Sequence, residues 1–192
     1  MQLLPHQIED AAFLASKTFA GNFSGMGSGK TLTALEAVNI VLSSGVLKTS
    51  VCIIAPPIAL HMWETETQRH CGLSTQILKT GTTKIKFYTD VIIMSYEIAT
   101  KRVAELKECR PAILICDESH ALKSVKAKRT KAILGKGGLA GFCSYSWMLT
   151  GTPQTRWNDD LFPFLCRAGM DKLIEKLGTV NMSRFMLRYC VV

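Results

Sequence analysis

Four short runs of apolar, mainly β-branched residues place the strongest constraint on how this chain can fold. They cover residues 51–55 (VCIIA), 90–95 (DVIIMS), 112–117 (AILICD) and 145–150 (YSWMLT). A strand that is apolar along its whole length is buried on both faces, as in a parallel sheet flanked by helices. Segments of helical character alternate with these strands at 30–43, 57–70, 96–107 and 125–134. The sequence therefore predicts a three-layer α/β domain with a mainly parallel central sheet and right-handed crossovers.

The composition is that of a globular domain from a reducing compartment. The chain has 192 residues, of which 47% are hydrophobic and 20% charged, enough apolar material for a buried core. No apolar run approaches the roughly 20 residues of a membrane span, and the start lacks the pattern of a secretory signal. Seven cysteines, none in a CxxC pair, predict reduced thiols. We therefore expect an intracellular protein, cytoplasmic or nuclear, that is neither secreted nor membrane-bound.

Residues 23–31, FSGMGSGKT, have the composition of a phosphate-binding loop. Gly29, Lys30 and Thr31 match the end of the Walker A pattern, whereas Ser24 stands where that pattern begins with glycine. The predicted nucleotide-binding residues are Ser24, Gly25, Met26, Gly27, Ser28, Gly29, Lys30 and Thr31. The glycines let backbone amides face an anion, Lys30 reaches the outer phosphates, and Thr31 is a magnesium ligand. A purely structural strand-to-helix turn is the alternative.

The segment AILICDESH supplies the acidic groups that a phosphate loop needs. Asp117 ends an apolar strand, where its carboxylate is predicted to hold Mg²⁺ together with Thr31. Glu118 is predicted to orient or deprotonate the attacking water, and Lys30, Asp117 and Glu118 are the expected catalytic residues. A solvated acidic turn is the alternative interpretation. His120, taken alone, is typical of a surface or capped residue.

Basic residues outnumber acidic ones, 23 to 15, giving a net charge of +8 that favours a polyanionic partner. Six of the basic residues lie between Lys123 and Lys136, a stretch without acidic residues. We expect this stripe, in particular Lys123, Lys126, Lys128 and Arg129, to contact nucleic-acid phosphates. A solvated helix face is the alternative.

In the order of its motifs, the chain resembles the first RecA-like lobe of a superfamily 2 helicase, most closely the Swi/Snf-type DNA translocases. The matching segments are LLPHQ (3–7), the phosphate loop, VCIIAPPIALHMWETE (51–66), DVIIMSYE (90–97), DESH (117–120) with Lys123, LTGTP (149–153) and FMLRY (185–189). The family's phosphate loop often begins with a small residue other than glycine, so Ser24 agrees with it. Trp63 and Met62 have helical spacing and are expected in the core rather than on DNA.

The resemblance implies a RecA-like P-loop NTPase fold that uses ATP with Mg²⁺ and moves on DNA, double-stranded in preference. It assigns Gln7 to the adenine, and His120, Thr150, Gly151 and Thr152 to coupling between the nucleotide and the nucleic acid. It also implies a second RecA-like lobe, in cis or in trans, that supplies arginine fingers. We expect residues 1–192 to form a single domain without that lobe, so that the isolated chain hydrolyses ATP weakly or not at all.

Two other functions remain open. A strand-separating helicase, or the motor subunit of a restriction system, would use the same nucleotide site. A non-enzymatic module that binds nucleic acid or protein would retain the shape of the lobe without needing both Asp117 and Glu118.

Overall fold

A six-stranded parallel sheet forms the centre of the protein. The computed structural model describes residues 3–45, 50–86, 88–153 and 158–168. The strands are β1 (Phe19–Asn22), β2 (Val51–Ile54), β3 (Thr75–Leu78), β4 (Val91–Met94), β5 (Ile113–Asp117) and β6 (Tyr145–Leu149). Their order is β1-β6-β5-β2-β4-β3, and every neighbouring pair is parallel. The predicted mainly parallel sheet is confirmed.

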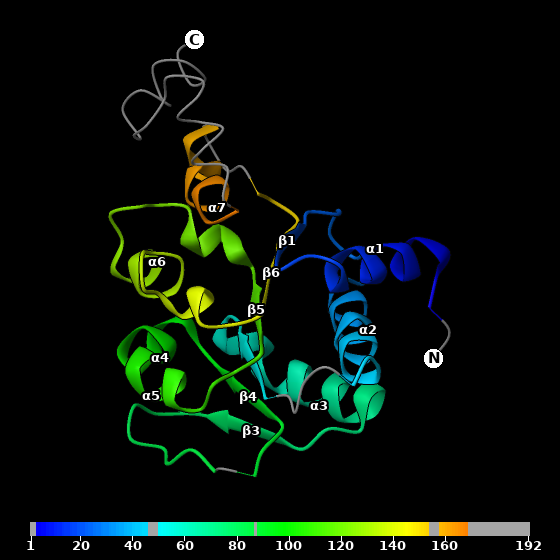
Figure 1. The fold of residues 1–192 in the computed structure, drawn as a ribbon, viewed down its shortest axis with the longest axis horizontal. Helices are drawn as coiled ribbons and strands as arrows, with labels where there is room; N and C mark the ends of the chain where they lie inside the picture. The colour runs from blue at the N-terminus through cyan, green and yellow to red at the C-terminus, as the bar shows by residue number, and fades with distance from the viewer. Residues whose placement is uncertain (1–2, 46–49, 87, 154–157, 169–192) are drawn as a thin grey trace.

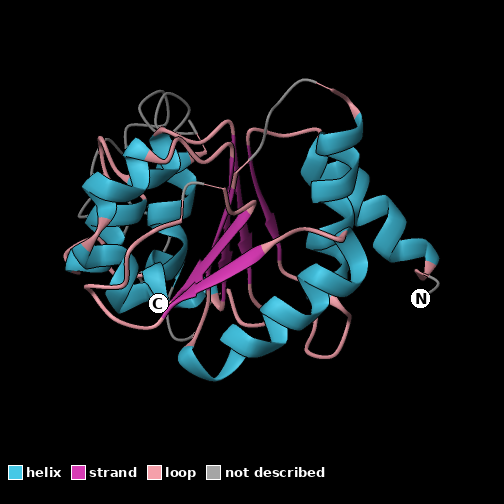
Figure 2. Cartoon of the chain, turned by 90° about the horizontal axis from the view of Figure 1, so that it is seen from below, coloured by secondary structure: helices cyan, strands magenta, loops and turns pink. Residues whose placement is uncertain are grey.

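Helices cover both faces of the sheet, which gives the three layers expected (Figures 1 and 2). One face packs against α1 (Pro5–Ala15), α2 (Lys30–Ser43) and α3 (Leu60–Cys71). The other packs against α4 (Tyr96–Lys101), α5 (Val103–Glu108), α6 (Lys128–Ile133) and α7 (Phe162–Arg167). Short 3₁₀ turns lie at η1 (Pro57–Ala59), η2 (Ser119–Leu122), η3 (Leu139–Gly141) and η4 (Asn158–Leu161). None of the helices in the described ranges is long and apolar enough to cross a membrane.

Alternate residues of the central strands point into two separate cores. Ile53 and Ile115 belong to the core under α1, α2 and α3, whereas Ile54 and Cys116 belong to the core under the other helices. All four side chains are fully buried. The strands are apolar along their whole length because both of their faces are covered.

Two strands, β1 and β3, and two helices, α1 and α7, were not predicted. β1 contains glycine and asparagine, which are depleted in strands, and β3 is a half-buried strand at the edge of the sheet with Thr75 and Gln76 in its sequence. The residues of both strands are therefore ones that are more common in loops. Helix α1 occupies the segment that contains LLPHQ, with Pro5 in its first turn, a favoured position for proline.

Three predicted helices differ in extent from those observed. The segment 57–70 begins as the 3₁₀ turn η1, and 125–134 is helical only from Lys128 to Ile133. The segment 96–107 is divided at Arg102, whose backbone leaves the helical region at φ −119° and ψ 21°. The buried Arg102 guanidinium binds Glu105 in the following helix, with Nε donating to Oε2 at 2.8 Å.

Truncating one central side chain is expected to measure the contribution of the core. Ile115→Ala removes a fully buried side chain from β5 and should lower the free energy of unfolding by about 2–5 kcal/mol. Ile8→Ala, at a residue of α1 that is 53% exposed, is the control and should change it by no more than about 0.5 kcal/mol. Urea unfolding followed by circular dichroism measures both. Equal effects would contradict the position assigned to Ile115.

Candidate functional site

The segments at the carboxyl ends of three strands, β1, β2 and β5, converge on one cleft, and the turn after β6 lies beside it. The phosphate loop follows β1, Pro56 follows β2, Glu118 follows β5 and the Thr150–Thr152 turn follows β6. The cleft has a volume of about 420 Å³. Its lining residues are Gly27, Gly29, Lys30, Thr31, Pro56, Ile58, Ala59, Met62, Asp117 and Glu118. In open parallel sheets this edge is where ligands bind.

The phosphate loop has the backbone conformation that its glycines allow. Gly27 and Gly29 have φ values of 76° and 81°, which an L side chain rarely adopts. Ser24 replaces the first Walker A glycine and holds the loop from inside. Its Oγ donates to Asn22 Oδ1 at 2.6 Å and lies 2.7 Å from Ser28 Oγ. The serine is therefore compatible with a closed loop.

Gln7 from α1 lies against the same loop. Its Oε1 accepts a hydrogen bond from Leu4 N at 2.9 Å, and its Nε2 donates to Ser28 O at 3.1 Å. A Cβ atom added at Gly29 would lie 2.1 Å from Gln7 Nε2. Gly29 is thus favoured by its positive φ, and a side chain there would displace the end of the Gln7 side chain.

Lys30 and the turn after β6 meet at the loop. Lys30 Nζ donates to the carbonyl oxygens of Ser24 and Gly25 at 2.9 and 2.8 Å. A Cβ added at Gly151 would lie 3.1 Å from Met26 Cγ and 3.6 Å from Lys30 Nζ. The predicted coupling turn is therefore in contact with the predicted nucleotide loop.

Each carboxylate oxygen of Asp117 accepts one hydrogen bond. Oδ1 accepts from Glu118 N at 2.9 Å, and Oδ2 accepts from Trp63 Nε1 at 2.8 Å. Burial raises the pKa of the Asp117 carboxyl, and these two hydrogen bonds oppose that rise. Tyr96 Oη donates to the Asp117 carbonyl oxygen at 2.6 Å. Asp117 is thus fixed by segments that follow β2 and β4.

Glu118 forms a network with the other predicted coupling residues. Its backbone is left-handed at φ 47°, a strained conformation for a residue with a side chain. Glu118 Oε2 accepts from Thr150 Oγ1 at 3.3 Å and lies 3.1 Å from His120 Nδ1. Thr150 Oγ1 lies 3.1 Å from that same nitrogen and accepts from Thr152 N at 3.1 Å. Glu118 is thus joined by polar contacts to His120, Thr150 and, through Thr150, Thr152.

The predicted basic stripe is not one continuous face. Lys123 is half-buried and lies 4.0 Å from Asp160 Oδ2, while Lys126 and Lys128 are exposed. Arg129 lines a cavity of about 300 Å³ that also contains Pro56, Glu118 and His120. The stripe divides because the helical period points successive side chains of α6 to different sides, and because Lys123, Lys126 and Lys136 lie outside that helix.

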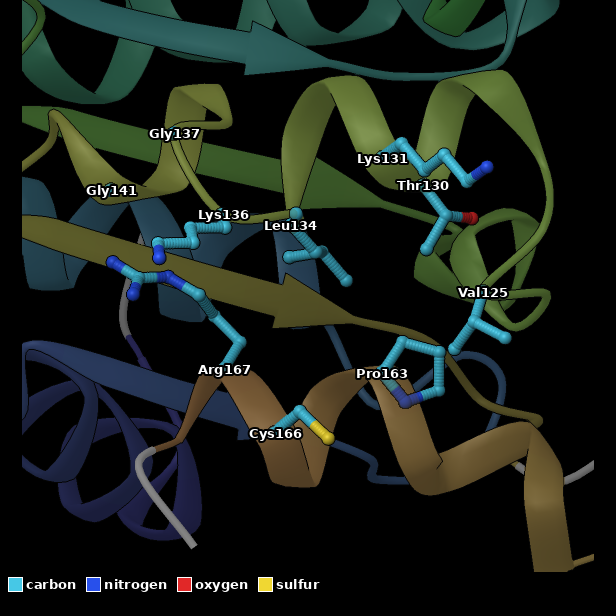
Figure 3. Close-up of a pocket in the computed structure, with 11 residues that line it drawn as sticks. Val125, Thr130, Lys131, Leu134, Lys136, Gly137, Gly141, Pro163, Cys166 and Arg167 are labelled. Atoms are coloured by element: carbon cyan, nitrogen blue, oxygen red, sulfur yellow. The ribbon is translucent and has the colours of Figure 1, made fainter. Parts of the chain in front are cut away.

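The later members of the stripe belong to a different cavity (Figure 3). Lys131 and Lys136 line a pocket of about 630 Å³, with Arg167 of α7 across from them. Arg167 donates to Ala140 O at 2.7 Å. The lining of this pocket shares no residue with the cleft that contains Lys30 and Asp117. This larger cavity is therefore separate from the candidate site.

Comparison with known families identifies the domain. The model of the SNF2-related domain matches residues 7–188. The chain belongs to this family. Membership of this family accounts for the order of the motifs along the chain. The resemblance to the first lobe of Swi/Snf-type superfamily 2 helicases is confirmed.

Relatives of this SNF2-related domain include much longer proteins. The human DNA repair and recombination protein RAD54B is 29% identical over 176 residues, covering 79% of this chain and 18% of the relative. The chromatin-remodeling ATPase INO80 of Sclerotinia sclerotiorum is 27% identical over 157 residues, covering 73% of this chain and 9% of the relative. The chain thus spans less than a fifth of these proteins.

Solved structures confirm the RecA-like fold of this SNF2-related domain. The Sulfolobus solfataricus SWI2/SNF2 ATPase core domain superposes with a TM-score of 0.76 at 25% identity, covering 97% of this chain and 38% of that one. The same core in complex with dsDNA gives a TM-score of 0.77 at 24% identity, with the same coverage of both chains.

Several contacts of the SNF2-related domain site were missed from sequence. Trp63 was expected in the core and is fully buried, but its indole N–H also binds Asp117. Met62 was expected in the core, which is wrong, since it is 42% exposed and lines the cleft. No sequence pattern predicted the hydrogen bond of Tyr96 to Asp117 or that of Asn22 to Ser24. The FMLRY segment (185–189) lies outside the described residues.

Proposed function

We propose that this chain is the ATP-binding first lobe of a DNA translocase, which hydrolyses ATP to move on double-stranded DNA when a second RecA-like lobe completes its site. The observation that carries the proposal is the cleft that Lys30, Thr31, Asp117 and Glu118 line together. These are the groups that phosphoryl transfer requires from this side of the nucleotide.

The loop from Ser24 to Thr31 is assigned to the phosphates of ATP. Lys30 Nζ donates to two uncharged carbonyl oxygens, and a phosphate oxygen, which is charged, is a stronger acceptor. Helix α2 begins at Lys30, so the positive end of its dipole favours an anion at the loop. We assign Gln7, which contacts the loop at Ser28, to the adenine end.

Thr31 and Asp117 are assigned to Mg²⁺, because hydroxyl and carboxylate oxygens are the ligands this ion prefers. The Asp117 carboxylate fits the role, since each of its oxygens accepts one hydrogen bond and keeps a lone pair. The bound ion supplies charge neutralisation on the transferred phosphoryl group.

Glu118 is assigned to the attacking water. Its side chain is 42% exposed, so solvent reaches it, and the Thr150 hydroxyl limits its rotation. His120, Thr150, Gly151 and Thr152 connect this carboxylate to the phosphate loop through the contacts described above. We infer that they couple nucleotide state to nucleic-acid binding.

The second lobe is required for fast turnover. Arginine fingers accelerate phosphoryl transfer by about 10³–10⁵-fold, and the family places them on the second lobe. We therefore expect the 192-residue chain alone to bind ATP but hydrolyse it slowly. This holds whether the second lobe lies in cis or in trans.

We propose double-stranded DNA as the polymer on which the protein moves. We also propose an intracellular location, which DNA as a partner requires. The net charge of +8 favours a polyanion. A fold neighbour was solved as a complex with dsDNA, and relatives carry names of DNA repair and chromatin remodelling.

Removing charge from the start of the basic stripe should weaken DNA binding. The triple variant Lys126→Gln, Lys128→Gln, Arg129→Gln should lower duplex affinity and reduce the salt slope by about 1 for each side chain that contacts phosphate. Affinity measured over a series of salt concentrations tests this. The triple variant Lys79→Gln, Lys84→Gln, Lys86→Gln removes the same charge from an exposed loop. Equal losses in both variants would remove the stripe from the interface.

A strand-separating helicase is the nearest alternative. Stimulation of ATP hydrolysis by single-stranded DNA beyond that by duplex DNA would favour it. A binding module without enzymatic activity is the other alternative, and the retained pair of carboxylates, Asp117 and Glu118, argues against it.

Titration of the chain with ATP, with and without Mg²⁺, tests whether the chain binds nucleotide, on which the rest of the proposal depends. Binding that Mg²⁺ strengthens is the expected result. A chain that binds no nucleotide under either condition would overturn the nucleotide-site assignment and favour the binding module.

A further inference from the structure

The Asp117 carboxylate has one side-chain hydrogen-bond donor among the described residues, the indole of Trp63. Trp63 Nε1 donates to Oδ2 at 2.8 Å, across 54 positions of sequence. The other oxygen, Oδ1, accepts from the backbone N–H of Glu118 at 2.9 Å. The two donors bind different oxygens, so together they determine the rotation of the carboxylate about its Cβ–Cγ bond.

The position of Trp63 within α3 makes this donor rigid. The indole is fully buried in the core between the sheet and the helices α1, α2 and α3. Its neighbour Met62 and Ile58 of η1 line the nucleotide cleft. One short segment therefore supplies both a wall of the cleft and the donor that orients the carboxylate.

We propose that Trp63 is a positioning residue for the metal site: its indole N–H holds the Asp117 carboxylate in the orientation that binds Mg²⁺ with the nucleotide. The inference rests on the proposed function, because it requires Asp117 to act toward the metal. It assigns to the indole N–H of Trp63 a role beyond the packing of a buried ring.

A second buried tryptophan distinguishes this role from packing. Trp147 of β6 is also fully buried, and its Nε1 has no hydrogen-bond partner among the residues that the structure describes. The core therefore tolerates an indole whose N–H is unpaired. Trp63 differs in that its N–H binds a carboxylate at the cleft, and partners of this kind typically set metal affinity.

The test compares Trp63→Phe with Trp147→Phe, because both changes replace a buried indole by a phenyl ring. The Mg²⁺ dependence of binding is measured for each chain with the non-hydrolysable ATP analogue AMP-PNP, and thermal melts establish that each variant is folded. Trp63→Phe should raise the half-saturating Mg²⁺ concentration about 10-fold or more. Trp147→Phe should leave it unchanged, and binding without Mg²⁺ should be the same in both.

Asp117→Asn separates failure of this inference from failure of the proposed function. A large effect of Asp117→Asn with equal half-saturation in the two tryptophan variants would overturn the role of Trp63 alone. No effect of Asp117→Asn would overturn the metal assignment, and this inference with it.

An NMR measurement on the unsubstituted chain applies even if Trp63→Phe does not fold. The assigned indole N–H signals are followed as Mg²⁺ is added to the chain with saturating AMP-PNP. The Trp63 signal should shift, since its acceptor is the carboxylate that meets the ion, and the Trp147 signal should not. A Trp63 signal that stays in place while Mg²⁺ strengthens binding would contradict the proposal.

Discussion

Replacing Lys30 with alanine is expected to reduce ATP hydrolysis by the two-lobe protein at least about 100-fold, the scale on which removing one group that stabilises developing charge acts. Lys30 is the one cation that lines the nucleotide cleft in the described part of the chain. Its ammonium group now lies on the carbonyl oxygens of Ser24 and Gly25, directly over the loop. No neighbouring side chain of that lining offers a substitute charge, so we expect both nucleotide affinity and turnover to fall.

Steady-state hydrolysis and nucleotide titration measure this effect. Lys17→Ala removes an exposed lysine outside the cleft and serves as the control, with activity equal to that of the unsubstituted protein. Turnover by Lys30→Ala within a few fold of the control would contradict the assignment of the loop.

Replacing Glu118 with glutamine is expected to separate binding from hydrolysis. The change preserves the size of the side chain and removes the charge that orients or deprotonates water, so turnover should fall by about 10²–10⁴-fold. Nucleotide binding should persist, because Lys30 and the glycine loop are unchanged. The left-handed backbone at Glu118 does not favour glutamine or glutamate over the other.

Single-turnover hydrolysis together with nucleotide titration measures both quantities. Glu9→Gln, on the exposed side of α1, removes the same charge away from the cleft. If Glu118→Gln loses binding and turnover in parallel, the residue supports the structure of the site and does not act on water.

The sequence predicted best those parts of the fold that are buried on both faces. The strands at 51–55, 90–95, 112–117 and 145–150 are all present, because two helical layers require them to be apolar throughout. β1 and β3 were missed, since one carries Gly21 and Asn22 and the other lies half-buried at the edge of the sheet.

Within the site, local motifs were predictable and distant pairings were not. The loop at 24–31 and the pair Asp117 and Glu118 each have a local pattern, and the structure places Gly27 and Gly29 to Thr31 of the loop in one cleft with both carboxylates. The hydrogen bond from Trp63 to Asp117 joins the segment after β2 to the last residue of β5, and the two become neighbours only through the sheet order. The division of the basic stripe follows from the helical period and from the bounds of α6, which exclude three of the six basic residues, and charge counting reveals neither.

The central claim is that this lobe belongs to a motor driven by ATP on duplex DNA. The most direct test measures ATP hydrolysis by the lobe together with its second lobe, with and without duplex DNA, and with Lys30→Ala as the inactive reference. We predict hydrolysis that duplex DNA stimulates and that Lys30→Ala abolishes. Hydrolysis that is absent with and without DNA, from a folded two-lobe protein that binds no ATP, would contradict the claim.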